Sequence, residues 1–202
     1  MFTVKNILKK MNLPVEGTDV VVQGMGNVGS NAAKIFRHRG SKVVAISDVS
    51  GGLYKEDGLD VDTIAEYLET SGALLKDYDA EGITHISNSE VLTTPCDVLV
   101  PAALENQITE ENADKLQCSY IVEAANGPTS KEADAILEKR GIPVIPDIFA
   151  NCGGVIVSYF EWVQNIQELT WSRERDNEML ADLMSKAFMD ILSVKKECDC
   201  TF

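Results

Sequence analysis

The chain has 202 residues, of which 45% are hydrophobic, and its formal net charge at pH 7 is −14. This apolar content suffices for a full hydrophobic core and excludes a disordered chain, while the excess of 32 acidic over 18 basic residues makes nucleic acid an unfavourable partner. Neither a signal segment nor a run of ~18 apolar residues is recognised, so we expect a cytoplasmic protein that does not insert into a membrane.

A glycine-rich turn follows the first expected strand. After an expected short helix over residues 2–11, the branched residues 20–22 predict a buried strand, and Gly24, Gly26 and Gly29 then form the motif G-x-G-x-x-G. The first glycine permits a tight turn, the second lets a pyrophosphate approach the backbone, and the third lets helix and strand pack closely. The helix that follows would direct free N–H groups and the positive end of its dipole at the pyrophosphate.

The next expected strand, residues 42–47, ends at an acidic residue, Asp48, which follows Gly29 by 19 residues. Dinucleotide-binding folds place an acid about 20 residues after the glycines, where it binds a ribose. A purely structural turn would explain the glycines but not the strand, helix and acid that surround them. The sequence therefore predicts a dinucleotide site.

The rest of the chain alternates between expected strands and helices. After Asp48 we expect a hairpin or loop at 50–54, a helix capped by Asp60 or Asp62 that runs to residue 71, and an extended piece at 84–87. A strand at 97–101, a helix at 109–116 and a strand at 119–124 are expected next. They are followed by a helix capped by Thr129 or Ser130 that runs to residue 140, a strand at 142–146, and helices at 155–169 and 177–194. This alternation predicts an α/β, Rossmann-like, doubly wound and mainly parallel sheet with helices on both faces and a helical C-terminal segment.

Ligands of such sheets bind beyond the carboxyl ends of the strands. The residues expected there include Ala102 and Ala103, whose small side chains leave room for a ring or a ribose, and the amides of Asn126 and Asn151, which could bind a carboxamide. The alternative is that both asparagines are turn residues that tolerate unusual backbone angles.

The cysteines and histidines show no metal-binding pattern. The chain has five cysteines at irregular spacing and two isolated histidines, and no C-x-x-C pair occurs. We therefore expect no metal site and free thiols in a reducing compartment.

Four stretches in the same order, residues 23–30, 102–109, 122–129 and 145–162, resemble the coenzyme-binding domain of glutamate dehydrogenases. The resemblance covers nearly the whole chain and departs from the family at Cys152, where alanine is usual. It implies one NAD(P)-binding domain over residues 1–202, without the catalytic domain or the final helix of the full-length enzyme.

The resemblance also implies an activity. Full-length enzymes of the family convert L-glutamate to 2-oxoglutarate and ammonium by hydride transfer to NAD(P), and the full-length protein is expected to be a homo-hexamer. The catalytic lysine and aspartate belong to the other domain, so we expect no catalytic residue on this chain and no turnover by it.

For the coenzyme, the resemblance assigns the pyrophosphate to Gly24, Gly26, Asn27, Val28 and Gly29, and the adenosine ribose to Asp48. It assigns the nicotinamide ribose to Ala102, Ala103 and Asn126, and the carboxamide to Asn151. For the substrate, it assigns the distal carboxylate of glutamate to Ser158, with Val155 close by. We expect NAD rather than NADP, because Asp48 would repel a 2′-phosphate and no Arg or Lys lies between residues 47 and 54; Lys42 or Lys55 reaching the phosphate would reverse this preference.

Two other functions remain open at this stage. A leucine-, valine- or phenylalanine-type dehydrogenase would use the same coenzyme domain, although its apolar substrate pocket does not favour Ser158. A non-catalytic module that senses NAD(H) and controls a partner would also use this fold.

Overall fold

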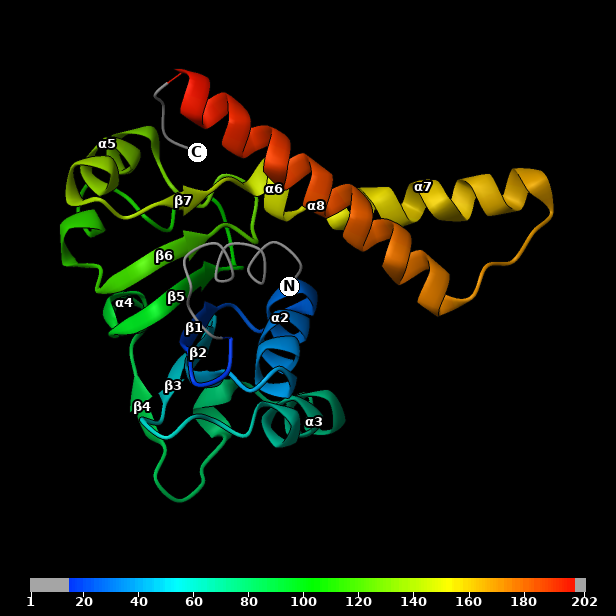
Figure 1. The fold of residues 1–202 in the computed structure, drawn as a ribbon. Coiled ribbons are helices and arrows are strands. Elements are labelled where there is room, and N and C mark those ends of the chain that lie inside the picture. The colour runs from blue at the N-terminus through cyan, green and yellow to red at the C-terminus, as the bar shows by residue number, and fades with distance from the viewer. Residues whose placement is uncertain (1–14, 199–202) are drawn as a thin grey trace.

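The structure, a computed structural model, describes residues 15–198. The helix expected over residues 2–11 lies outside the described residues. The described part forms a seven-stranded sheet in the order β4-β3-β2-β1-β5-β6-β7 (Figure 1). Its strands are β1 (Asp19–Gln23), β2 (Lys42–Asp48), β3 (Gly51–Tyr54), β4 (Thr84–Ile86), β5 (Cys96–Pro101), β6 (Cys118–Val122) and β7 (Val144–Ile145).

The sheet is mainly parallel, as expected. Strand β1 pairs in parallel with β2 and β5, and the parallel arrangement continues through β6 to β7. Strands β3 and β4 add an antiparallel edge, because β2 turns directly into β3 as a hairpin. The helices are α2 (Asn27–His38), α3 (Val61–Ser71), α4 (Asn88–Thr93), α5 (Lys131–Arg140), α6 (Asp147–Ala150), α7 (Cys152–Gln167) and α8 (Arg173–Cys198), with 3₁₀ turns η1 (Leu75–Asp77) and η2 (Ala113–Lys115).

Helices cover both faces of the sheet, and the alternation along β1 shows how. Val20 and Val22 are buried on one face against residues of α2, α3 and α8, whereas Val21 is buried on the other face with residues of α4, η2 and α5. Successive strand residues point to opposite faces, so three adjacent valines supply both cores. The expected doubly wound α/β fold is thus confirmed.

The helix ends follow from side-chain and glycine caps. Asp60 caps α3 by accepting a hydrogen bond from the Thr63 N–H at 3.3 Å, and Ser130 caps α5 by accepting one from Ala133 at 3.2 Å. Gly141 ends α5 in the left-handed region, at φ 70°, which glycine adopts without strain. Asp62, the alternative cap of α3, instead forms ion pairs with α2.

Three expectations about local structure were wrong. Residues 109–116 do not form a regular helix, because the Asn112 side chain accepts from the Thr109 N–H and makes a turn that leaves only η2. Residues 147–154, expected as a loop, contain α6 and the first turn of α7. Helix α4 was not foreseen, although Ser87 and Glu90 form a capping box at its start.

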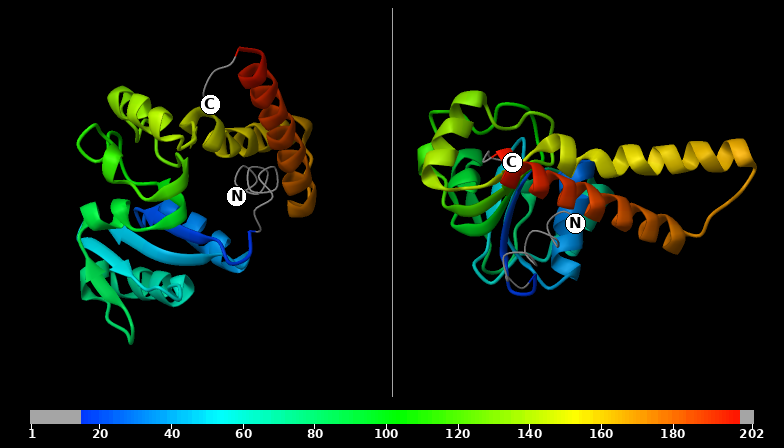
Figure 2. Two further views of the ribbon diagram at one scale, coloured as in Figure 1. Left: turned by 60° about the vertical axis from the view of Figure 1, so that its left-hand side comes forward. Right: turned by 45° about the horizontal axis from the view of Figure 1, so that its top comes forward.

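Helix α7 extends away from the sheet, and α8 runs back from its tip to the domain, where Met184 and Phe188 are buried (Figures 1 and 2). Four apolar residues of α7 follow one another at three- and four-residue steps and lie on one side of the helix: Val155, Tyr159, Trp162 and Ile166. We call these four residues the α7 stripe. Each is more than half exposed, between 57% and 73%. Within residues 15–198, no helix is both long enough and apolar enough to cross a bilayer.

Candidate functional site

The strand order places a crevice beside β1. From β1 the chain passes to β2 on one side, and it later returns to β5 on the other side. Doubly wound sheets bind ligands at such a switch point, beyond the carboxyl ends of the strands. The glycine turn follows β1, and Ala102 follows β5, where its N–H donates to the Gln23 carbonyl at 2.8 Å.

Two of the three glycines are required by packing. Gly24 has φ 100°, and a Cβ there would lie 2.9 Å from the Ala102 carbonyl oxygen. A Cβ on Gly29 would lie 1.8 Å from the Gly24 carbonyl oxygen. A side chain at position 24 would push the turn away from the segment after β5 and strain its backbone, and one at position 29 would push α2 away from the turn, so the predicted mechanical roles of these two glycines are confirmed.

The third glycine borders free space. A Cβ on Gly26 would meet no described atom within 4 Å, and Gly26 begins α2 without a side-chain cap among the described residues. The first turn of α2, which includes Asn27 and Val28, contains no acidic residue. The first N–H groups of a helix have no partner within the helix. The residues present therefore fit a pyrophosphate, which would be held by these N–H groups and by the helix dipole.

A pocket of about 860 Å³ opens beyond the carboxyl ends of the central strands. Its volume lies within the range of small-molecule sites. Its lining brings together residues from α2 and from the segments that follow β5, β6 and β7. Among them are Val28, Ala102, Ala103, Asn126 and Asn151. The expectation that Ala102, Ala103, Asn126 and Asn151 lie together beyond the strand ends is therefore confirmed, while the part of a coenzyme that each residue would contact stays a prediction.

The two expected amides are in contact. The Asn151 Nδ2 donates to the Asn126 Oδ1 at 3.0 Å, and it lies 3.3 Å from the Ala125 carbonyl oxygen. Asp147 supports this arrangement, because its carboxylate accepts from the Gly127 N–H at 2.8 Å. Each amide retains hydrogen-bonding groups beyond this contact, so a carboxamide could bind between them.

Glu123 is a buried residue of the site that the sequence analysis missed. It is 7% exposed, directly after β6, and its Oε2 accepts from the Asp147 N–H at 2.9 Å. Loss of solvation on burial raises the pKa of its carboxyl group, although the hydrogen bond from the Asp147 N–H and the nearby Thr129 hydroxyl oppose this shift. An acid at the end of an otherwise apolar strand was the available signal.

Asp48 lies at the end of β2, as expected, but its carboxylate already has partners. One oxygen accepts from the N–H and hydroxyl of Ser50, and the other accepts from the Leu75 N–H at 2.8 Å. The carboxylate thus holds η1 against the β2–β3 turn. A carboxylate accepts about four hydrogen bonds, so it could accept one more from a ribose.

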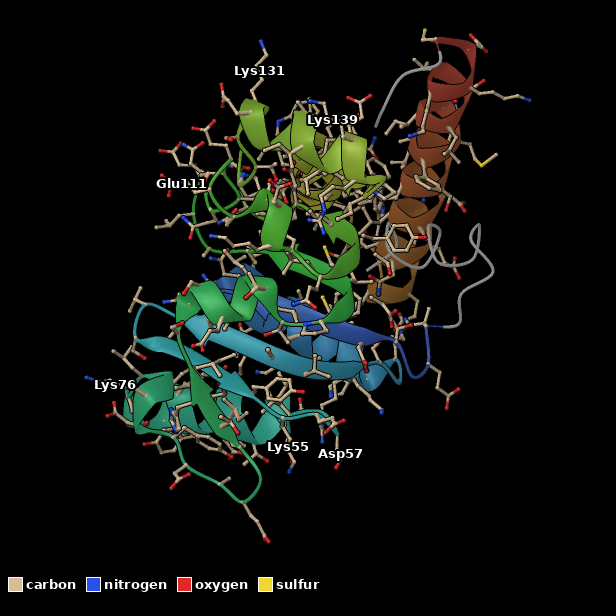
Figure 3. All side chains as sticks on the ribbon, turned by 90° about the vertical axis from the view of Figure 1, so that its left-hand side faces the viewer. Lys55, Asp57, Lys76, Glu111, Lys131 and Lys139 are labelled. Carbon is tan, nitrogen blue, oxygen red and sulfur yellow. The ribbon has the colours of Figure 1, made fainter. Side chains whose placement is uncertain are left out.

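Neither lysine that the sequence offered for a 2′-phosphate is near Asp48. Lys42 is the first residue of β2, whereas Asp48 is the last. The Lys55 N–H donates to the Val44 carbonyl, near the start of β2, so both lysines lie at the opposite end of the strands from Asp48. Lys76 was missed: its backbone N–H donates to the Ser50 hydroxyl at 3.1 Å. Figure 3 shows the side chains of Lys55 and Lys76 leaving the domain at separate places.

Ser158 and Val155 are not among the described residues that line the pocket. The Ser158 hydroxyl donates to the Gly154 carbonyl at 3.1 Å within α7, and both side chains are exposed. Their assignment to substrate therefore stays a prediction. In the described part of the chain, no three His, Cys, Asp or Glu side chains are grouped as metal ligands, and the described cysteines are free thiols.

Comparison with known proteins agrees with this geometry. The family model of the glutamate/leucine/phenylalanine/valine dehydrogenases matches residues 1–202. The chain belongs to this family. Its relatives include a cryptic catabolic NAD-specific glutamate dehydrogenase of Bacillus subtilis, 48% identical over 93% of the chain and 43% of the relative. An NAD-specific glutamate dehydrogenase of Staphylococcus aureus is 44% identical over 97% of the chain and 46% of the relative.

Solved structures of the family have the same fold. A hetero-hexameric glutamate dehydrogenase of Thermus thermophilus in a leucine-bound form matches with a TM-score of 0.89 and 31% identity, over 97% of this chain and 45% of that one. Glutamate dehydrogenase 2 of Plasmodium falciparum matches with a TM-score of 0.91 and 28% identity, over 99% and 46%. The chain therefore spans less than half the length of these relatives.

Proposed function

We propose that the chain is the coenzyme-binding domain, residues 1–202, of an NAD-dependent glutamate dehydrogenase. The observation that carries the proposal is the free space at Gly26, above the uncapped start of α2 and beside the pocket at the switch point of the sheet. The NAD-specific glutamate dehydrogenases of Bacillus and Staphylococcus support it. The complete enzyme would convert L-glutamate to 2-oxoglutarate and ammonium.

The chain's own residues would bind and orient the coenzyme. The N–H groups at Gly26, Asn27 and Val28 would hold the pyrophosphate. Ala102 and Ala103 would leave room for the nicotinamide ribose, and Asn126 with Asn151 would orient the carboxamide. When bound, NAD supplies the hydride acceptor. The groups that move protons would belong to polypeptide outside this chain.

The preference for NAD would come from charge. Asp48 keeps a carboxylate at the end of β2, held in place by Ser50 and Leu75. This charge would accept a hydrogen bond from a ribose hydroxyl and repel a 2′-phosphate. The names of the two bacterial relatives support the same preference.

The substrate and the assembly are proposed for the complete enzyme. There, Ser158 would donate a hydrogen bond to the distal carboxylate of glutamate, with Val155 beside it. A hexamer is proposed because the similar Thermus enzyme is described as hetero-hexameric. That the six subunits are identical and that the enzyme is cytoplasmic are proposals that rest on the family resemblance alone.

Calorimetric titration of the purified chain with NAD⁺ tests the proposal. We expect one binding site per chain and no NADH on addition of glutamate, because the missing acid–base groups alone contribute about 10²–10⁴-fold to rates. Absence of NAD⁺ binding would refute the coenzyme role. Steady NADH production would show that the catalytic groups lie on this chain.

A further inference from the structure

Next to the segment that lines the pocket, two glutamine side chains form a pair that the proposed function does not use. Gln23 is the last residue of β1 and is only 3% exposed. Its Nε2 donates to the Oε1 of Gln107 at 2.9 Å, although the two residues are 84 positions apart in the chain. The pair therefore joins the strand that precedes the glycine turn to the segment that follows β5.

Gln107 also contacts the next segment of the site. Its backbone N–H donates to the Pro128 carbonyl at 2.8 Å, and its carbonyl accepts from the Asn112 side chain at 2.8 Å. Its Nε2 donates back to the Glu105 carbonyl at 3.1 Å. Gln107 thus connects the end of β1 to the segments that follow β5 and β6, and it helps to fix their positions relative to one another.

Stability alone does not explain a glutamine at position 23. Its Oε1 is buried, and no hydrogen-bond donor among residues 15–198 reaches it. A buried acceptor without a partner opposes folding, and an apolar side chain of similar size avoids that cost. A polar residue that costs stability beside a ligand site is typical of a functional role.

The backbone of the segment that Gln107 holds turns sharply just before it. Asn106 has φ 52°, a left-handed angle that asparagine adopts more readily than other non-glycine residues, and its N–H donates to the Gly127 carbonyl at 2.9 Å. Ala102 and Ala103 of the same segment line the pocket, so the pair next to this segment controls where that wall lies.

We propose that Gln23 and Gln107 are positioning residues for the nicotinamide half of the coenzyme. This inference rests on the proposed function, because the pair would act on the coenzyme only through the pocket wall formed by residues 102–105. The glycine turn is fixed separately, by the close contact of Gly29 with Gly24 and by the Gly24 N–H donating to the Ser47 hydroxyl at 3.3 Å. Loss of the pair should therefore weaken nicotinamide binding and spare pyrophosphate binding.

The test compares NAD⁺ with ADP, which has the pyrophosphate and the adenosine but neither the nicotinamide nor its ribose. For Gln23→Leu, we expect the calorimetric affinity for NAD⁺ to fall about tenfold, which is ~1.4 kcal/mol, and the affinity for ADP to change less than about twofold. The melting temperature should change little, because removal of the unpaired buried acceptor offsets loss of the hydrogen bond to Gln107.

Two further variants complete the experiment. Gln107→Met removes the same contact at a half-buried position, so it keeps the test valid if Gln23→Leu fails to fold. The double variant should lose no more NAD⁺ affinity than either single one, because both remove one interaction. Gln117→Leu is the matched control: its Nε2 donates to the Thr93 carbonyl at 3.1 Å, beside the start of β6, and it should change neither affinity.

Each contrary result has a distinct meaning. Equal losses of NAD⁺ and ADP affinity would show a general structural role and overturn the inference, and so would unchanged affinity for both. A large fall in melting temperature with unchanged binding would overturn it as well. Absence of NAD⁺ binding by the unsubstituted chain would instead overturn the proposed function, and this inference with it.

Discussion

Substitution of two neighbouring glycines should separate coenzyme binding from folding. Gly26 has φ −75°, which any residue adopts, and a Cβ there meets no described atom within 4 Å. Gly26→Val should therefore fold normally, while its branched side chain fills the space above the start of α2. Loss of one hydrogen bond to a charged group costs about 1.5–3 kcal/mol. The affinity for NAD⁺ should then fall at least tenfold, since ~1.4 kcal/mol corresponds to tenfold.

Gly29→Ala is the matched control, because it adds a smaller group where no space exists. Its Cβ would lie 1.8 Å from the Gly24 carbonyl oxygen, whereas ordinary contact begins at 3.4 Å, so the two must separate by 1.6 Å. Overpacking of this kind costs roughly 1–3 kcal/mol. For a chain of this size, each kcal/mol lowers the melting temperature by about 2–4 °C.

Calorimetry with NAD⁺ and thermal unfolding followed by circular dichroism measure the two effects. The expected outcome is a crossed result: Gly26→Val keeps its melting temperature and loses affinity, whereas Gly29→Ala loses stability. If Gly26→Val binds NAD⁺ as tightly as the unsubstituted chain, the dinucleotide lies elsewhere. If Gly26→Val unfolds, the reasoning from free space at position 26 is wrong.

Three further predictions concern specificity and pH. Asp48→Ala should raise the affinity for NADP relative to NAD about tenfold, because the repelling charge is removed near Lys76. Competitive titration measures this ratio of affinities, and an unchanged ratio would show that another residue determines the preference. In the complete enzyme, Ser158→Val should lower kcat/KM for glutamate roughly 10–100-fold, because it loses a hydrogen bond worth ~1.5–3 kcal/mol, and it should leave coenzyme affinity unchanged. If the ratio of kcat/KM for glutamate to kcat/KM for norvaline does not change, Ser158 is an ordinary helix serine. Burial raises the pKa of the Glu123 carboxyl in the folded chain, so the folded state binds this proton more tightly and loses stability as the pH rises through and above the ordinary carboxyl range. Glu123→Gln should remove that dependence in urea unfolding at several pH values, and parallel pH profiles would contradict it.

The sequence predicted features that depend on neighbouring residues. The strand at residues 20–22, the glycine turn and the helix after it form a local unit whose packing follows from three missing side chains. The caps at Ser130 and Gly141 are equally local. Such features depend only on the backbone conformation and a few adjacent residues, and most of the strands and helices could be predicted from them.

The features that were missed or misplaced depend on side-chain contacts that hydrophobic periodicity does not record. Some of these contacts are local: the Asn112 side chain bonds to Thr109 and Gln107 and turns the segment before η2, and a capping box of Ser87 and Glu90 begins α4. Lys42 and Lys55 are near Asp48 in the sequence but lie at the other edge of the sheet, since direction along a strand decides which edge a residue reaches. Glu123 and Gln107 likewise gain their roles from contacts formed only after the strands are ordered.

The α7 stripe has a consequence for the behaviour of the chain in solution. Four exposed apolar side chains on one helix favour contact between molecules, whereas a net charge of −14 opposes it. The distance over which that repulsion acts falls from about 10 Å at 0.1 M salt to about 3 Å at 1 M. Solutions of the chain should therefore be most strongly repulsive in dilute buffer, and their second virial coefficient should fall towards attraction as salt is added.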